Sequence, residues 1–73
     1  MKKTYEIYVD CANCGEQMQE TIKKVDGVAD ANVNYMMQKV TIDFEDGVDE
    51  KKVLKEALKQ SRKKVDDDIE IKF

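Results

Sequence analysis

Residues 29–44, which read ADANVNYMMQKVTIDF, carry the pattern that decides the fold. Apolar or small side chains alternate with polar ones on both sides of a break at residues 36–38. Because alternation with a period of two is typical of a strand with one buried face, the stretch predicts a hairpin of two strands. The alternating residues are Ala29, Ala31, Val33 and Tyr35 before the break, and Val40, Ile42 and Phe44 after it.

A strand and a helix are predicted before this hairpin. Apolar residues alternate over residues 4–9, and over residues 16–25 they take helical spacing with polar residues on the opposite face. The Asp26-Gly27 pair is expected to end the helix. The apolar residues of the two elements are Tyr5, Ile7, Val9, Met18, Ile22 and Val25.

A second helix and a last strand are predicted after the hairpin. Asp49 is a suitable N-cap for the helix, and the basic residues at 59–64 suit the negative end of its dipole. Alternation over residues 69–73 predicts the strand. The apolar stripe of the helix is Val53, Leu54, Ala57 and Leu58.

The predicted order is strand, helix, strand, strand, helix, strand, which indicates an α+β, ferredoxin-like βαββαβ sandwich. Right-handed crossovers then place both helices on one face of a four-stranded antiparallel sheet, with the first and third strands in the centre. We expect residues 1–73 to form one domain, with the turn at residues 36–38 at the end away from the loop at residues 10–14. The predicted core is Tyr5, Ile7, Val9, Met18, Ile22, Val25, Val33, Val40, Ile42, Val53, Leu54, Ala57, Leu58 and Ile71.

The composition excludes several classes of function. The chain has 73 residues, no His and two Cys, so imidazole-dependent hydrolysis and histidine zinc ligands are excluded. A net charge of -3 and a pI near 4.9 argue against a nucleic acid or an anionic membrane as partner. Because there is no apolar run long enough to span a bilayer and no signal-peptide pattern, we expect a cytoplasmic chain with no membrane insertion by this segment.

The chemistry is concentrated at Asp10-Cys11-Ala12-Asn13-Cys14, between the first strand and the first helix. The two-residue spacing lets both sulfur atoms point into one small volume. The N-terminus of a helix favours thiolate over thiol, and thiolates bind soft and borderline metal ions. The motif therefore predicts an open metal site.

Other interpretations of the cysteine pair stay open. A dithiol oxidoreductase would also place two cysteines at a helix start, although Ala12-Asn13 is not the usual insert. A structural zinc site needs four ligands, which one chain with two Cys and no His does not supply unless two chains share the ion. The cysteines could also be incidental to a metal-blind interaction module.

The stretch from Val9 to Cys14, together with Val25-Asp26-Gly27-Val28 at the end of the helix, resembles the heavy-metal-associated domain family. This family comprises small cytosolic metallochaperones and N-terminal domains of metal-transporting P-type ATPases. The resemblance covers essentially the whole chain. It implies metal transfer rather than an enzyme activity, with cytosolic domains of a metal-transporting ATPase as partners. We expect the chain to act as a monomer.

The resemblance also implies roles for individual residues. Cys11 and Cys14 fall on the two metal-binding cysteines. Asp10 falls where copper-handling members commonly have Thr and some zinc, cadmium and lead transporters have Asp. Two thiolates suit Cu+, whereas a divalent ion takes about four ligands and accepts a carboxylate, so Zn2+, Cd2+ or Pb2+ is the leading expectation and Cu+ the alternative. Asp10 could instead cap the helix.

Two further positions bear on the site. Lys63 or Lys64 is expected near the metal loop, where an ammonium group would offset the charge of the loaded site, although a solvated basic helix end explains both residues equally well. Met36 and Met37 could bind Cu+ through their thioethers, but their expected place in a distant turn favours turn or edge packing.

Overall fold

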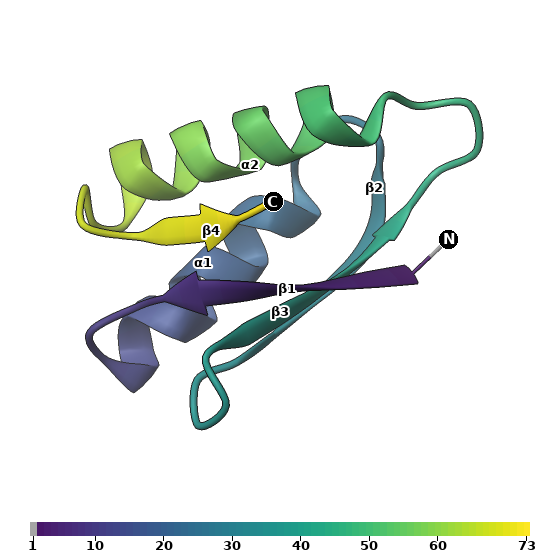
Figure 1. Ribbon diagram of the computed structural model, residues 1–73. Helices are drawn as coiled ribbons and strands as arrows, with labels where there is room; N and C mark the ends of the chain where they lie inside the picture. Colours follow the sequence, from purple (N-terminus) through teal and green to yellow (C-terminus); the bar gives the residue numbers. More distant parts are fainter. Residues whose placement is uncertain (1) are drawn as a thin grey trace.

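The computed structural model describes residues 2–73 and confirms the predicted order of elements (Figure 1). The two helices lie on one face of a single four-stranded sheet. Neither helix of the described chain is long and apolar enough to cross a membrane. The elements are β1 (Lys2–Tyr8), α1 (Ala12–Lys23), β2 (Val28–Asn34), β3 (Lys39–Phe44), α2 (Glu50–Lys64) and β4 (Glu70–Lys72).

The strand order is β2-β3-β1-β4, and every neighbouring pair is antiparallel, so β1 and β3 are central as predicted. Each helix carries the chain back along the sheet, and β1 and β2 therefore run in the same direction. Three connections consequently meet at the end where β1 stops: β1–α1, β2–β3 and α2–β4. We call this the cysteine end; it lies on the left in Figure 1.

The expectation that the β2–β3 turn lies away from the cysteine loop is wrong. The backbone N–H of Ile7 donates to the carbonyl oxygen of Gln38 at 2.9 Å, and the N–H of Val9 donates to the side-chain oxygen of Gln38 at the same distance. The turn therefore lies directly beside the chain that enters the cysteine loop. The reason is that α1 returns the chain to the start of the sheet, so β2 runs in the same direction as β1 and ends at the same end of the sheet.

The core agrees with the prediction at most positions. Tyr5, Val33 and Leu58 are only partly buried against the core. Four buried hydrophobic residues were not predicted: Val28, Ala31, Phe44 and Ile69. The pattern in β2 differs because the register shifts between Val28 and Asp30, so Val28 and Ala31 are both buried although they lie an odd number of residues apart.

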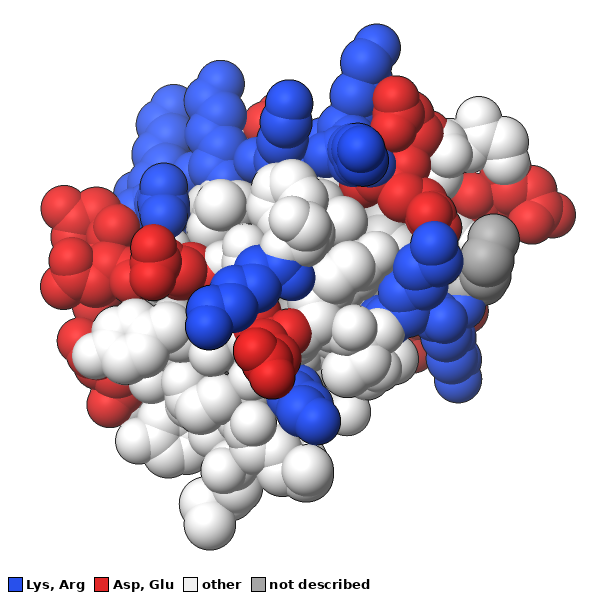
Figure 2. Space-filling model, in the orientation of Figure 1, with Lys and Arg blue, Asp and Glu red and all other residues white. Residues whose placement is uncertain are grey.

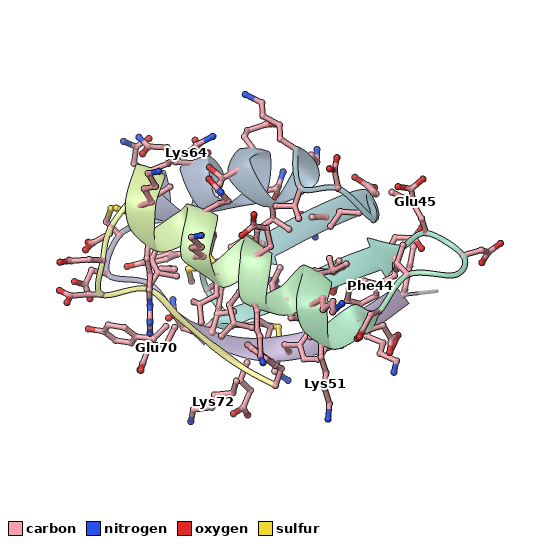
Figure 3. All side chains as sticks on the ribbon, turned by 90° about the horizontal axis from the view of Figure 1, so that it is seen from above. Phe44, Glu45, Lys51, Lys64, Glu70 and Lys72 are labelled. Carbon is pink, nitrogen blue, oxygen red and sulfur yellow. The ribbon has the colours of Figure 1, made fainter. Side chains whose placement is uncertain are left out.

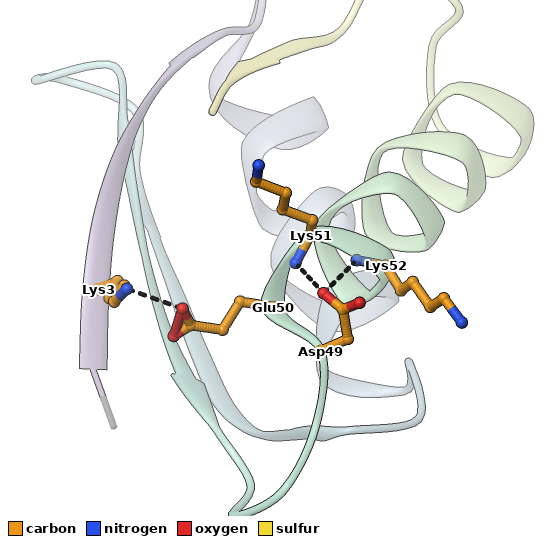
Figure 4. Close-up of polar contacts among 5 residues, drawn as sticks. All are labelled: Lys3, Asp49, Glu50, Lys51 and Lys52. Carbon is orange, nitrogen blue, oxygen red and sulfur yellow. Dashed lines mark hydrogen bonds and ion pairs between the residues drawn. The ribbon is translucent and has the colours of Figure 1, made fainter.

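The start of α2 is fixed by Asp49, as predicted. Its carboxylate accepts the backbone N–H groups of Lys51 and Lys52 at 3.1 and 3.5 Å, and the next residue, Glu50, pairs with Lys3 of β1 at 2.7 Å (Figure 4). The Asp49 contacts cap the helix, and the Lys3–Glu50 pair holds its first turn against the sheet. They fix the end of α2 that is remote from the cysteine end.

Candidate metal centre

The cysteine loop is organised by Cys11, which is the N-cap of α1. Its backbone is extended, and its sulfur accepts the N–H of Cys14 at 3.1 Å while its carbonyl accepts the N–H of Gly15 at the same distance. A side-chain acceptor at the N-cap satisfies one of the free N–H groups of the first turn. Cys11 takes this capping role, and Asp10 is free to point elsewhere.

Cys14 lies in the first turn of α1, half-buried like Cys11, and neither residue forms a disulfide. Hydrogen bonding to Cys11, partial burial and the negative charges of Cys11, Asp66 and Asp10 raise the pKa of Cys14 to about 11. The positive end of the helix was expected to favour thiolates, but for Cys14 these neighbours outweigh it. At neutral pH the cysteine pair of the apo site therefore holds a proton, which a metal ion must displace.

Asp10 belongs to an acidic cluster formed with Asp66 and Asp68, in which one carboxylate oxygen from each residue lies within 4.8 Å of the others. Among residues 2–73, this cluster includes neither Cys11 nor Cys14. Asp66 and Asp68 come from the α2–β4 connection, where the N–H of Asp68 donates to the Asp66 carboxylate at 3.0 Å. The charges of Asp66 and Asp67, burial and the charge of Asp10 raise the pKa of Asp68. Acidic side chains also form a patch at the left of Figure 2, below the basic side chains of α2.

Sequence reasoning missed Asp66 and Asp68. The signal was present, because the run of three aspartates stands just before β4 and the α2–β4 connection returns to the end where β1 stops. The charge that this cluster brings to Cys14 depends on two segments more than fifty residues apart in sequence. Only the fold brings them together.

Two tyrosines also contact Asp10. Hydrogen bonding to the Asp10 carboxylate, followed by its charge, raises the pKa of Tyr8, which is 51% exposed. The Tyr35 hydroxyl donates to the Asp10 backbone oxygen at 3.4 Å. Asp10 is thus held through its side chain from β1 and through its backbone from the β2–β3 turn.

The predicted lysines lie at the end of α2, with Lys64 labelled in Figure 3. Lys64 and Asn13 of the first turn of α1 line the same groove, whereas Lys63 lies with Lys55 and Lys59 on another side of α2. Within residues 2–73, neither lysine forms an ion pair or hydrogen bond with Asp10 or the cysteines. Lys64 is therefore the better placed of the two to act on the site through its charge.

The methionines of the β2–β3 turn are more exposed than expected. Met36 is 88% exposed and Met37 is 62% exposed, at the cysteine end of the molecule. They are turn residues, as predicted, but neither packs against the edge of the sheet to any large extent. Val9, which precedes the loop, is by contrast buried.

Two sulfur donors and a carboxylate cluster thus lie at the same accessible end of the molecule, and both are donor types that metal ions accept. The model of the heavy-metal-associated domain matches residues 4–64. The chain belongs to the heavy-metal-associated domain family. The metal-binding class expected from the sequence is thereby confirmed.

Solved structures of heavy-metal-associated domains share the fold. The CopZ metallochaperone is 18% identical, with a TM-score of 0.73 over 99% of this chain and 100% of that one. The N-terminal domain of a potential copper-translocating P-type ATPase from Bacillus subtilis, solved in the Cu(I)-loaded state, is 22% identical, with a TM-score of 0.73 over 99% and 84% of the two chains. A copper binding domain from HMA7, a P-type ATPase, is 20% identical with a TM-score of 0.71, over 99% and 93%. No curated protein matches the sequence.

Proposed function

We propose that residues 1–73 form one domain that binds Zn2+, Cd2+ or Pb2+ through Cys11, Cys14 and Asp10 and passes the ion to a partner by ligand exchange. The metal ion is the cargo of the domain. The partner would be a cytosolic domain of a metal-transporting P-type ATPase, or the domain would itself be part of such an ATPase. The P-type ATPase domains among the solved relatives support this context.

The observation that carries the choice of metal is the acidic cluster at the cysteine end, because the charges of Asp66 and Asp10 act on Cys14. Two thiolates and the Asp10 carboxylate give three negative charges, and Asp66 and Asp68 place further carboxylates within 4.8 Å of Asp10. Borderline divalent ions accept mixed sulfur and oxygen ligands and prefer about four of them. A monovalent ion bound by two thiolates gains less from this much negative charge.

Transfer by ligand exchange fits the exposure of the site. Cys11 and Cys14 are half-buried and Asp10 is exposed, so a thiolate or carboxylate of a partner can reach the ion before the first ligands leave. With only three proposed protein ligands, a four-coordinate ion keeps one position open. The domain needs no covalent step to release its cargo.

Cu+ is the second candidate, and the copper proteins among the solved relatives favour it. Competitive metal titration of the wild type and Asp10→Ala separates the candidates. If Asp10 is a ligand, the substitution weakens Zn2+ and Cd2+ binding and leaves Cu+ binding nearly unchanged. Unchanged Zn2+ and Cd2+ affinity in Asp10→Ala would overturn the ligand role of Asp10.

The oxidoreductase interpretation is tested on the same protein. A domain that reduces a disulfide substrate catalytically and does not bind metal ions tightly would contradict the proposed function. Conversely, Cys11→Ser/Cys14→Ser should abolish metal binding. A partner that still binds the double variant unchanged, in the presence and absence of metal, would point to a metal-blind interaction module.

A further inference from the structure

The side chain of Gln38 joins the β2–β3 turn to the chain that enters the cysteine loop. Its oxygen accepts the backbone N–H of Val9 at 2.9 Å, and its amide nitrogen donates to the carbonyl oxygen of Tyr35 at 2.8 Å. Its own carbonyl oxygen accepts the N–H of Ile7 at 2.9 Å. Two hydrogen bonds of Gln38 thus join the two segments, and the third fixes its side chain within the turn.

The turn that carries Gln38 is itself well fixed. The N–H of Gln38 donates to the Tyr35 carbonyl at 3.2 Å, and the N–H of Met37 donates to the Asn34 side chain at 3.1 Å. Gln38 has a φ of +53°, in the left-handed region that non-glycine residues seldom adopt. This conformation directs a half-buried side chain across to β1 instead of continuing the strand.

Val9 is the last buried residue before the proposed ligands Asp10 and Cys11. Val9 follows the last paired residues of β1, which are Glu6 with Lys39 of β3 and Tyr8 with Glu70 of β4, so its N–H lies outside the described strand pairing. Gln38 supplies the missing acceptor. One residue further on, the Tyr35 hydroxyl donates to the Asp10 carbonyl at 3.4 Å, so the same turn holds two successive residues of the loop.

We propose that Gln38 is a positioning residue for the metal site: its side chain fixes the backbone at Val9 so that Asp10 and Cys11 are presented to the ion together with Cys14. This inference rests on the proposed metal-binding function. Removal of a group that hydrogen-bonds to metal ligands and orients them typically lowers metal affinity by about 10–100-fold. Gln38 acts on the backbone of the ligands and does not touch the ion.

The test uses two substitutions that tolerate the left-handed backbone, Gln38→Asn and Gln38→Gly. Asparagine is one methylene shorter, and glycine removes the side chain. Gly47→Ala is the matched control, because Gly47 has a φ of +80° with nothing within 4 Å of an added Cβ, and it lies in the β3–α2 loop remote from the cysteine end. It loses stability through backbone strain alone.

Cd2+ is the probe. Its binding is measured by the thiolate-to-metal charge-transfer absorbance and by competition with a chelator. Both Gln38 variants should bind Cd2+ at least about tenfold more weakly, with an altered absorbance band, whereas Gly47→Ala should match the wild type in affinity and band. The proposal would be overturned if the Gln38 variants bound Cd2+ as tightly as the wild type. It would also be overturned if they lost no more affinity than Gly47→Ala at an equal loss of stability.

Amide hydrogen exchange of the apo protein tests the positioning role without metal. The amides to follow are those of Val9 and of Cys14, whose N–H donates to the Cys11 sulfur. Their exchange rates, measured relative to those of the core amides, should be higher in Gln38→Gly than in Gly47→Ala. Unchanged relative exchange at both amides would contradict the inference. A wild-type protein that binds no metal ion would contradict the proposed function instead, and the exchange result would still decide whether Gln38 positions the loop.

Discussion

The proton on Cys14 links the acidic surroundings of the site to its chemistry. Hydrogen bonding to Cys11, partial burial and nearby negative charges raise the pKa of Cys14 to about 11. The same negative charges attract a metal cation. The residues that favour the loaded site therefore also favour the protonated apo site, and binding becomes an exchange of a proton for a metal ion.

The apparent affinity for Cd2+ should accordingly rise with pH. Because Cys14 is a thiol below about pH 11 and binds metal as a thiolate, each unit of pH should raise the apparent association constant at least about tenfold between pH 6 and pH 8. Chelator competition at several pH values measures the slope. Cys14→Ser should have a shallower slope, and an affinity of the wild type that does not change with pH would contradict this coupling.

Neutralising the α2–β4 carboxylates should weaken the binding of divalent ions. Asp66→Asn/Asp68→Asn removes two negative charges near Asp10, and we expect Cd2+ affinity to fall roughly tenfold at low salt and Cu+ affinity to fall less. Asp67→Asn is the control, because Asp67 is exposed and lies outside the cluster. Equal losses in the double variant and the control would show that only long-range charge matters.

At the scale of elements, the sequence was sufficient wherever apolar periodicity was regular. It predicted all six elements, the Asp49 cap and the central strands. It placed the apolar stripe of α1 correctly but not its start at Ala12, because the first turn is polar and is capped by a cysteine sulfur. It also missed the bulge in β2, which no alternation pattern reveals.

The junction between α1 and β2 depends on Gly27. Its φ of +94° is left-handed, and an added Cβ would lie 2.9 Å from Cγ2 of Val53 and 3.2 Å from Cγ1 of Val48. We expect Gly27→Ala to lower the free energy of unfolding by about 2–4 kcal/mol, since strain and overpacking add. Gly47→Ala, with strain alone, should lose about 1–2 kcal/mol. Urea denaturation measures both losses in the free energy of unfolding. Equal losses in the two variants would show that the structure accommodates the added Cβ next to Val53 without further destabilisation.

At the scale of the whole molecule, charge is strongly segregated. Seven basic and two acidic residues give α2 a formal charge of +5, which leaves -8 on the rest of a chain whose net charge is -3 (Figure 2). The acidic α2–β4 loop directly follows the basic end of α2. Cys11, Cys14 and Asp10 could be predicted because they are adjacent in sequence, whereas Asp66, Asp68 and Gln38 reach the same place only through the topology of the sheet.

The whole fold should therefore gain stability from the metal ion that it holds. Binding to the folded state alone adds about 2.7 kcal/mol when free metal is 100 times the dissociation constant, and about 1 kcal/mol raises the Tm of a domain of this size by roughly 4–8 °C. We expect Cd2+ to raise the Tm by roughly 10 °C or more in thermal denaturation, and a chelator to reverse the shift. Cys11→Ser/Cys14→Ser should keep the Tm of the apo protein and show no shift.

The size of this rise in Tm shows whether the short cysteine motif holds the ion by itself or whether residues brought close by folding contribute to binding. An unfolded chain still carries Asp10, Cys11 and Cys14 within five residues, and any metal that it binds reduces the stabilisation. Asp66, Asp68 and Gln38 act on the site only in the folded chain. Asp66→Asn/Asp68→Asn and Gln38→Gly should therefore reduce the Cd2+-induced rise in Tm as well as the affinity. If both variants keep the full rise, the short motif alone holds the ion and the rest of the cysteine end contributes nothing to binding.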